Sequence, residues 1–376
     1  MIKYIDENPQ DWLGKKVLLR VDFNVPAKGH NSGNNFRVRS HRDTVDFLLG
    51  AGAKVLLVSH ITAADSFNLI VESLGLSLGQ TLTMIPHEEL SSLGNIFKAC
   101  SVVLLDNIRQ NDGEEQNDDQ LAQNLAKRVD VFVNDAFSVS HRPHASVVNI
   151  IKYLPAYGGL LLKKEIKNLT GALAAPPVGK TLLLGGAKIS TKLPVIKNFL
   201  NKADHILIGG ALANDFFQAQ GYEIGASVVD STISPDIDTN TVFLPIDIII
   251  SDEKSGRSLT QVSGVKNLLP GESILDIGPE TAKYFGDIIK KSTLVIWNGP
   301  MGLSEIDQFA KGTKDVAEAV SAAKNSIIGG GDTITAVDKF GLLDKYSFVS
   351  TGGGAMLEFL AGNELPGLKA LGYYDK

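Results

Sequence analysis

The sequence predicts an α/β protein of two domains, each built on a mostly parallel sheet that helices cover on both faces. Three observations support this fold class. Short apolar runs alternate with helix-like stretches almost throughout the chain. Four of the later runs end in glycine clusters that lead into a helix-like stretch, which is the order of elements in a parallel sheet. The length of 376 residues suits about two domains of ordinary size.

The expected elements follow the chain in a regular order. In the first part, apolar runs predict strands at 17–21, 55–59, 102–105 and 131–134. Amphipathic stretches at 44–49 and 120–128 predict helices between them. The second part repeats the pattern, with strands expected at 181–184, 205–208, 293–297, 326–328 and 347–350. Such an alternation is typical of parallel sheets.

The boundary between the domains is expected at residues 161–177. Their sequence, LLKKEIKNLTGALAAPP, predicts one helix that stops at a Pro-Pro pair. We therefore expect a first domain at 1–160, a joining helix and hinge at 161–177, and a second domain at 178–363. Residues 364–376 are too few for a domain, and we expect them to dock as a tail on the first domain.

Composition excludes several classes of protein. A hydrophobic content of 44% and a charged content of 21% are those of a soluble globular protein. The net charge of −6 argues against general affinity for nucleic acid or anionic membranes. Cys100 is the single cysteine, which rules out a disulfide framework and a cysteine-rich zinc site. No signal peptide or membrane-spanning run is apparent, so we expect a cytoplasmic protein without membrane partners.

The glycine clusters are the first functional signal. The four runs are TLLLGGAK at 181–188, ILIGGALA at 206–213, IIGGGDT at 327–333 and FVSTGGGA at 348–355. A strand that stops at glycines and becomes a helix leaves backbone N–H groups and a positive dipole end free to bind phosphate. Any one of these loops could be a simple turn, whereas four at the carboxyl ends of parallel strands favour a phosphate site.

Three charged residues in these loops suit a polyphosphate bound to Mg²⁺. Asp332 could be a helix N-cap, a Mg²⁺ ligand, or both. Lys188 and Lys192 are spaced one helical turn apart; they are either solvated surface residues or groups that neutralise a phosphoryl group during transfer.

A second cluster of candidates lies in the first part of the chain. Arginines occur at the ends of expected strands, where surface charge is less expected, and with His60 and Asn24 they predict a pocket for a small, multiply anionic ligand. These arginines are Arg20, Arg37, Arg109 and Arg142. Arg109 is expected to end a buried strand. The run from His141 to His144 could bind metal, but no acid-rich partner set accompanies it.

A loop after the run LVIW completes the nucleotide signal. Residues 298–302, NGPMG, and the following Glu305 form either a turn and a helix start or the wall of an adenine pocket with an acid for the ribose hydroxyls. Neither G-x-G-x-x-G nor G-x-x-x-x-G-K-[ST] occurs, which weakens an unrelated dehydrogenase and a P-loop enzyme.

Taken in order, ten segments resemble the phosphoglycerate kinase family along nearly the whole chain. They are RVDFNVP at 20–26, FRVR at 36–39, SH at 59–60, LLDNIR at 104–109, NDAF with SHRPH at 134–144, GGAKISTK at 185–192, LDIGPET at 275–281, WNGPMG at 297–302, GGGDT at 329–333 and STGGGA at 350–355. Ten segments in the family's order are far more specific than any single glycine motif.

The resemblance implies two Rossmann-like lobes joined by an interdomain helix, and reversible, Mg²⁺-dependent phosphoryl transfer from 1,3-bisphosphoglycerate to ADP, giving 3-phosphoglycerate and ATP, with hinge-bending closure of a monomeric enzyme. It assigns glycerate binding to Asp22, Phe23, Asn24, Arg37, His60, Ile61, Thr62, Ala63, Arg109 and Arg142. It assigns nucleotide binding to Gly186, Lys188, Lys192, Asn298, Pro300, Glu305, Gly330, Gly331, Asp332 and Thr333, with Asp332 on Mg²⁺. Catalysis would fall to Arg37, Lys192 and the amides of Gly330 and Gly331.

One departure from the family pattern bears on activity. After Ser59 and His60 the family continues L-G-R-P, whereas this chain reads ITAA, with Ala63 in place of the arginine. Loss of one charge-assisted hydrogen bond could weaken substrate binding about ten- to a hundredfold. The alternative to an active kinase is therefore a nucleotide-binding protein of the same fold with impaired or lost turnover.

Overall fold

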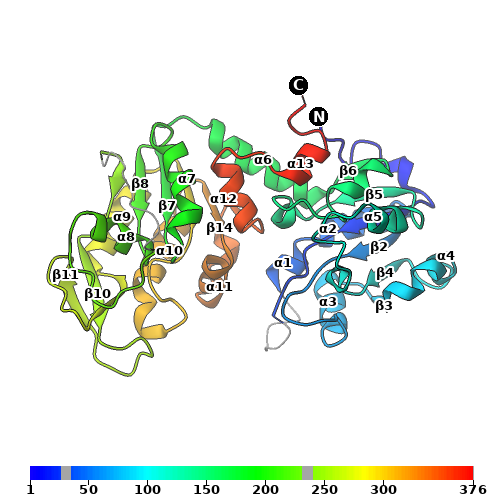
Figure 1. Cartoon of the computed structure of the whole chain (residues 1–376). Helices are drawn as coiled ribbons and strands as arrows, with labels where there is room; N and C mark the ends of the chain where they lie inside the picture. The colour runs from blue at the N-terminus through cyan, green and yellow to red at the C-terminus, as the bar shows by residue number, and fades with distance from the viewer. Residues whose placement is uncertain (27–34, 231–239, 376) are drawn as a thin grey trace. The chain divides into compact units, whose positions relative to one another are not determined.

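A computed structural model describes residues 1–26, 35–230 and 240–375. The chain divides into two compact units, Met1–Lys167 with Glu364–Lys376, and Asn168–Asn363. Helix α6, Leu160–Ala174, carries the chain from the first unit into the second (Figure 1). In the described parts of the chain, no helix is long and apolar enough to cross a membrane.

The first unit contains a six-stranded, wholly parallel sheet in the order β3-β4-β2-β1-β5-β6. Its strands are β1 Lys16–Arg20, β2 Lys54–Val58, β3 Thr83–Ile85, β4 Val102–Leu105, β5 Val131–Asn134 and β6 Ala156–Gly158. Its helices are α1 Phe36–Arg39, α2 Arg42–Gly50, α3 Val71–Leu78, α4 Leu93–Ile96, α5 Asp119–Ala126 and, near the C-terminus, α13 Pro366–Ala370.

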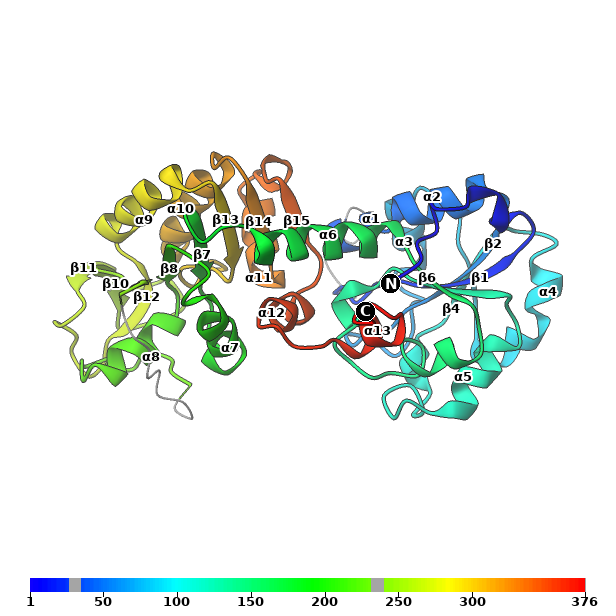
Figure 2. The same ribbon diagram turned by 90° about the horizontal axis from the view of Figure 1, so that it is seen from above.

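Alternate residues of β1 serve two different cores. Val17 and Leu19 pack with residues of α1, α2 and α3, whereas Leu18 packs with residues of α4 and α5. In Figure 2, α2 and α5 accordingly lie on opposite sides of the sheet. Because both faces are covered, the strands are apolar throughout rather than alternating, as the sequence indicated. The C-terminal segment joins this unit through a hydrogen bond from the Gly367 amide to the Ser140 carbonyl of 2.8 Å.

The second unit contains another six-stranded parallel sheet, in the order β15-β14-β13-β7-β8-β9. Its strands are β7 Lys180–Leu184, β8 His205–Ile208, β9 Val242–Phe243, β13 Leu294–Asn298, β14 Ser326–Gly329 and β15 Phe348–Ser350. Its helices are α7 Ile189–Phe199, α8 Leu212–Ala219, α9 Pro279–Lys291, α10 Lys311–Ser321, α11 Gly331–Lys339 and α12 Gly354–Leu360.

Two features depart from the sequence-based expectations. The second unit also holds a small antiparallel sheet, made of β10 Asp247–Ser251 between β11 Gln261–Gly264 and β12 Ser273–Ile277. In the first unit, β4 ends at Leu105, so Arg109 does not end a strand; it lies in a short 3₁₀ helix, η4 Ile108–Gln110. The predicted fold class, two mostly parallel sheets flanked by helices, is confirmed.

Candidate functional site

Charged side chains of the first unit gather at the carboxyl ends of β1 and β2. Arg20 is the last residue of β1, Asp22 follows it by two residues, and His60 follows β2 by two residues. Strands β1 and β2 are parallel neighbours, so their ends meet at the same edge of the sheet. This edge is where α/β proteins bind ligands.

Arg20 is a fully buried cation that several groups hold in place. Its Nε donates to the Ser146 hydroxyl at 2.8 Å, and its Nη2 lies 3.8 Å from the Glu114 carboxylate. Glu114 in turn accepts hydrogen bonds from the amide and hydroxyl of Ser146. Burial lowers the pKa of Arg20, and the charge of Glu114 opposes that effect. A buried pair with these added hydrogen bonds stays fixed, because removing one partner would leave an uncompensated charge.

Asp22 is an ionised carboxylate beside this cation. Burial disfavours its charge, but Arg37 Nη1 lies 3.2 Å away, and the Ser138 hydroxyl and Asn24 amide donate hydrogen bonds. The net result is a pKa lowered to about 2. Arg37 also donates to the Asn24 carbonyl at 3.2 Å. Asp22 therefore binds together Asn24 and Arg37, two of the predicted glycerate-binding residues.

The imidazoles around Arg20 are neutral at pH 7. Burial and the adjacent Arg20 lower the pKa of His60 to about 3, with Nδ1 lying 3.4 Å from Arg20 Nη2. Burial and neighbouring arginines, with Glu114 opposing them at His144, lower the pKa of His141 and His144 to about 4. An anionic ligand bound in such a site reduces the repulsion between its positive charges.

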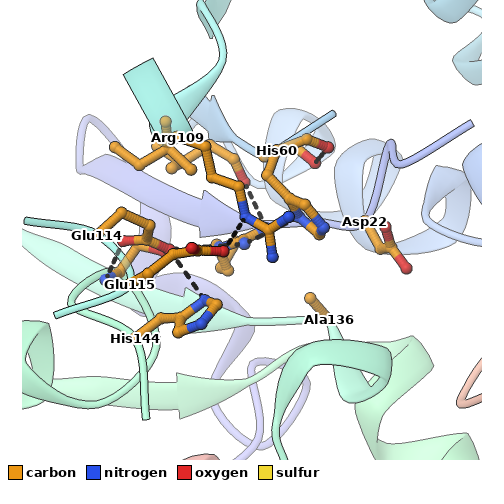
Figure 3. A network of polar contacts seen from close by, with 12 residues as sticks. Asp22, His60, Arg109, Glu114, Glu115, Ala136 and His144 are labelled. Carbon is orange, nitrogen blue, oxygen red and sulfur yellow. Dashed lines mark hydrogen bonds and ion pairs between the residues drawn. The ribbon is translucent and has the colours of Figure 1, made fainter. Parts of the chain in front are cut away.

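Arg109 has hydrogen-bonding capacity to spare. Its Nε forms an ion pair with Glu115 at 3.0 Å, and within the described chain its buried Nη2 has no hydrogen-bond partner (Figure 3). The Asn107 side chain accepts from the amides of both Arg109 and Ile61, at 3.2 Å each, and so ties η4 to the loop after β2. Arg142 is exposed and donates to His141 Nε2 at 3.3 Å. An unpaired guanidinium donor is suited to a carboxylate or phosphate.

The four remaining predicted glycerate residues, Phe23 in the segment after β1 and three residues in the loop after β2, differ in exposure. Phe23 and Ile61 are buried in the hydrophobic core, so only their backbones are available to a ligand. Thr62 is exposed, and its amide and hydroxyl donate to the Asn24 side-chain oxygen at 3.0 and 2.9 Å. Ala63 is exposed and brings no charge.

The four glycine runs of the second unit follow β7, β8, β14 and β15, and the NGPMG loop follows β13, so these loops lie at the carboxyl ends of adjacent strands. Hydrogen bonds between backbones lock the loops together. The Gly185 amide donates to the Asn298 carbonyl at 3.0 Å, and the Gly186 amide donates to the Pro300 carbonyl at 2.9 Å. The Gly210 amide donates to the Met301 carbonyl at 2.9 Å. The loops therefore form one preformed surface.

A cavity of about 190 Å³ opens beside these loops. Its lining is mainly apolar, with polar groups at a few points, as is typical of a small-molecule site. Apolar members include Ala211, Ala213, Phe217, Val228, Pro245, Ile248, Ile274 and Met301, and the polar side chains are those of Lys254, Asp276, Glu305 and Asp332. Four predicted nucleotide-binding residues line the cavity, namely Gly186, Pro300, Glu305 and Asp332.

The start of α11 presents backbone amides next to this cavity. Gly330 is the N-cap residue, with φ of 98°, so Asp332 is not the N-cap; it is an exposed residue of the first helical turn. The Thr333 hydroxyl accepts from the Gly299 amide at 2.7 Å and joins the helix start to the loop after β13. First-turn N–H groups have no acceptor within their own helix, so they can bind an anion.

Lys188 and Lys192 have different environments. Lys188 is the exposed N-cap residue of α7 and not part of the helix proper. Lys192 is 7% exposed. Burial lowers its pKa, the Asp332 carboxylate raises it, and Lys188 lowers it further. The charges of Lys192 and Asp332 therefore interact with each other beside the glycine loops.

The described residues contain no group of three or more His, Cys, Asp or Glu side chains able to hold a metal ion. One carboxylate is nevertheless enough for Mg²⁺ bound with a nucleotide, because this ion keeps several waters and takes phosphate oxygens as ligands. The exposed Asp332 carboxylate beside the α11 amides fits that requirement.

Three buried residues of the site region were not singled out from the sequence. Glu114, His41 and Asp135 are each at most 1% exposed and contact partners far away in sequence. No local motif marks them as members of one network.

The chain is similar to known proteins both in its sequence and in its structure. The sequence model of the phosphoglycerate kinase family matches residues 8–363. The structure is similar to that of a phosphoglycerate kinase from Coxiella burnetii, with a TM-score of 0.82 and 32% identity over 100% of both chains. It is similar also to a phosphoglycerate kinase from Pyrococcus horikoshii OT3, with a TM-score of 0.86 and 31% identity over 99% of this chain and 98% of that one.

Proposed function

The chain belongs to the phosphoglycerate kinase family of phosphotransferases, and we propose that its first unit binds the glycerate substrate and its second unit the nucleotide. Its reaction is the reversible, glycolytic transfer of a phosphoryl group between 1,3-bisphosphoglycerate and ADP, which yields 3-phosphoglycerate and ATP. The observation that carries the division of labour is the contrast between the two sites, one cationic and the other lined by backbone amides.

The glycerate ligand binds at the cationic edge of the first sheet. Arg109 has a buried donor without a partner among the described residues, and Arg37 is anchored by Asp22 but remains partly exposed, with 27% of its side chain accessible. The depressed pKa values of His60 and His141 are in keeping with the same assignment, since burial lowers them most and the charges of neighbouring arginines lower them further. Binding falls to the side chains of Asp22, Asn24, Arg37, His60, Thr62, Arg109 and Arg142, with the backbones of Phe23, Ile61 and Ala63.

The nucleotide binds to the glycine loops and in the adjoining cavity of the second unit. The apolar lining receives the base, and Glu305 at its rim accepts from the ribose hydroxyls. The phosphates meet the amides of the α11 start, Lys188 at the N-cap of α7 and Lys192 within that helix. This assignment covers Gly186, Lys188, Lys192, Asn298, Pro300, Glu305, Gly330, Gly331, Asp332 and Thr333.

Transfer of the phosphoryl group needs positioning and charge neutralisation, with no nucleophilic side chain. Arg37 from the first unit and Lys192 from the second neutralise the charge on the group in flight, and the amides of Gly330 and Gly331 donate to its oxygens. Mg²⁺, held through Asp332, neutralises charge on the nucleotide phosphates when bound. A desolvated Lys192 is worth more here than in water, because the local dielectric is low.

The two substrates bind to separate units, so turnover requires a closure that brings them together. Helix α6 supports this proposal, since one continuous helix of 15 residues belongs to both units. We further propose a cytoplasmic monomer without nucleic-acid or membrane partners, in keeping with a net charge of −6 and a single cysteine.

The test is a coupled assay with 3-phosphoglycerate and MgATP, combined with calorimetric titration of each ligand. Turnover is expected in the coupled assay. Arg109→Ala should weaken the binding of 3-phosphoglycerate alone, and Asp332→Ala should weaken the binding of MgADP alone. Measurable ADP binding without any turnover would instead support the nucleotide-binding protein that Ala63 suggests as the alternative.

A further inference from the structure

A chain of buried hydrogen bonds leads from the Asp22 loop to the first turn of α6. The Asp22 amide donates to His41 Nε2 at 3.0 Å. His41 Nδ1 lies 2.7 Å from the Asp135 carboxylate. His41 and Asp135 are 1% and 0% exposed, so water does not compete for these bonds.

The two partners of His41 permit only one arrangement of its proton. A backbone N–H can only donate, so Nε2 must be the acceptor and carry no hydrogen. Nδ1 therefore carries the proton and donates it to the carboxylate oxygen of Asp135. The imidazole is held in this neutral tautomer by a partner on each side.

The other oxygen of Asp135 reaches the interdomain helix. Its Oδ1 accepts from the amides of Leu161 and Leu162 at 2.9 and 3.3 Å. The adjacent Gly159 leaves room for this carboxylate, because a Cβ there would lie 2.1 Å from Oδ1. One residue earlier, the Leu160 amide donates to the Thr44 hydroxyl at 3.0 Å, so α6 has a second, separate anchor on α2.

We propose that His41 is a positioning residue for the kinase reaction, and that Asp135 sets its tautomer so that it holds the Asp22 backbone while anchoring α6. The consequence for binding follows from Asp22. Its carboxylate forms an ion pair with Arg37 and accepts a hydrogen bond from the Asn24 amide. A shift of the Asp22 backbone therefore moves Asp22, Asn24 and Arg37 together. This inference rests on the proposed binding of glycerate by Asp22, Asn24 and Arg37.

The decisive variant is Asp135→Asn. Its amide oxygen can still cap α6, but its NH₂ group then faces His41 Nδ1 as a donor. The imidazole must move its proton to Nε2, where it opposes the Asp22 amide, donor against donor. We expect the KM for 3-phosphoglycerate to rise about five- to tenfold. The kcat should change by less than about twofold, and the Kd for ADP should be unchanged.

Thr44→Val is the matched control. It removes the other anchor of the same helix end and leaves His41 with both partners, so it should lower Tm without altering the KM for 3-phosphoglycerate. The tautomer is read directly from ¹⁵N shifts of histidine-labelled protein, which has 7 histidines. His41→Gln identifies the His41 signal and should raise the same KM, which provides a second test if Asp135→Asn folds poorly.

Two results would overturn the inference. One is an unchanged Nδ1–H tautomer in Asp135→Asn, and the other is an equal KM in Asp135→Asn and Thr44→Val. Failure of the underlying assignment is distinguishable from both, because Asp22→Asn would then leave 3-phosphoglycerate binding intact as well. If Asp22→Asn weakens binding and Asp135→Asn does not, the glycerate site stands and the role of His41 falls.

Discussion

Lys192 is a buried cation whose burial and nearby Asp332 shift its pKa in opposite directions. Replacement by alanine removes charge that matters most while the phosphoryl group is between donor and acceptor. We expect kcat to fall about a hundredfold or more, with the Kd for ADP changing by less than about threefold. Lys197→Ala, on the exposed side of the last turn of the same helix, is the control and should retain activity. Equal losses in kcat and ADP affinity would contradict a transition-state role.

Ala63 permits a test of the cationic edge in the opposite direction. An arginine at this exposed position adds a donor for an anionic ligand near Thr62, which already hydrogen-bonds Asn24. We expect Ala63→Arg to tighten 3-phosphoglycerate binding about tenfold, measured by calorimetric titration. Ala63→Gln lengthens the side chain without charge and should have little effect. No gain in affinity would mean that other residues have rebuilt this part of the pocket.

The sequence singled out the residues that we propose to contact ligands, but not the buried residues behind them. Lys192 and Asp332 occur in glycine loops that point to phosphate chemistry, and Arg37 and His60 belong to the predicted cationic cluster. Glu114 and Asp135 were not singled out, although Asp135 lies in the NDAF segment, because their roles depend on Arg20 and His41, which join them only in the folded chain. Sequence alone also could not separate Lys188 from Lys192, since helical spacing says nothing about which of the two is buried.

At the scale of elements, the loops after β7 and β13 leave no room for side chains. A Cβ on Gly185 would lie 2.1 Å from the Pro300 carbonyl oxygen and 2.7 Å from that of Gly299, both backbone atoms. Gly185→Ala must therefore push the two loops apart. We expect ADP affinity to fall about tenfold or more in a calorimetric titration, with a loss of stability of about 1–3 kcal/mol.

Gly171→Ala is the matched control for that variant. Gly171 lies on the exposed side of α6, and a Cβ there would meet no atom within 4 Å. Alanine favours a helix over glycine by about 0.5–1 kcal/mol, so Tm should rise by about 1–3 °C with ADP binding unchanged. Unchanged ADP affinity in Gly185→Ala would show that the loops yield and do not form one fixed surface.

Elements were predicted where they are long and buried on both faces. The central strands of both parallel sheets were anticipated to within about a residue or two, the usual uncertainty at element ends. The antiparallel sheet was missed, because apolar β10 carries no sign of its partners and β11 is largely exposed and polar. The short edge strands β3, β6 and β9 were missed too, since two or three residues show no period.

Over the whole molecule, titratable groups with displaced pKa values divide between the two units. The first unit holds His60, His141 and His144, whose pKa values burial lowers to between about 3 and about 4. The second holds Asp215 and Asp276, whose pKa values burial raises to about 6 and about 7. Asp22, with its pKa lowered to about 2, adds stability that is constant above about pH 4 and is lost only as the pH falls below that value.

The two units should therefore respond to acid in opposite ways. Between pH 4 and about 6.5 the three histidines take up protons only on unfolding, so the first unit loses stability as pH falls. Asp215 and Asp276 hold protons in the folded state that unfolding releases, so the second unit loses stability as pH rises from about 4 to 7. The chain has two tryptophans, Trp12 in the first unit and Trp297 in the second, both at most 2% exposed. In thermal melts followed by fluorescence, Trp297→Phe should show a transition about 2–5 °C lower at pH 5 than at pH 7, and Trp12→Phe one higher by a similar amount. Transitions that move together in both variants would mean that the histidine and aspartate effects do not divide between the units.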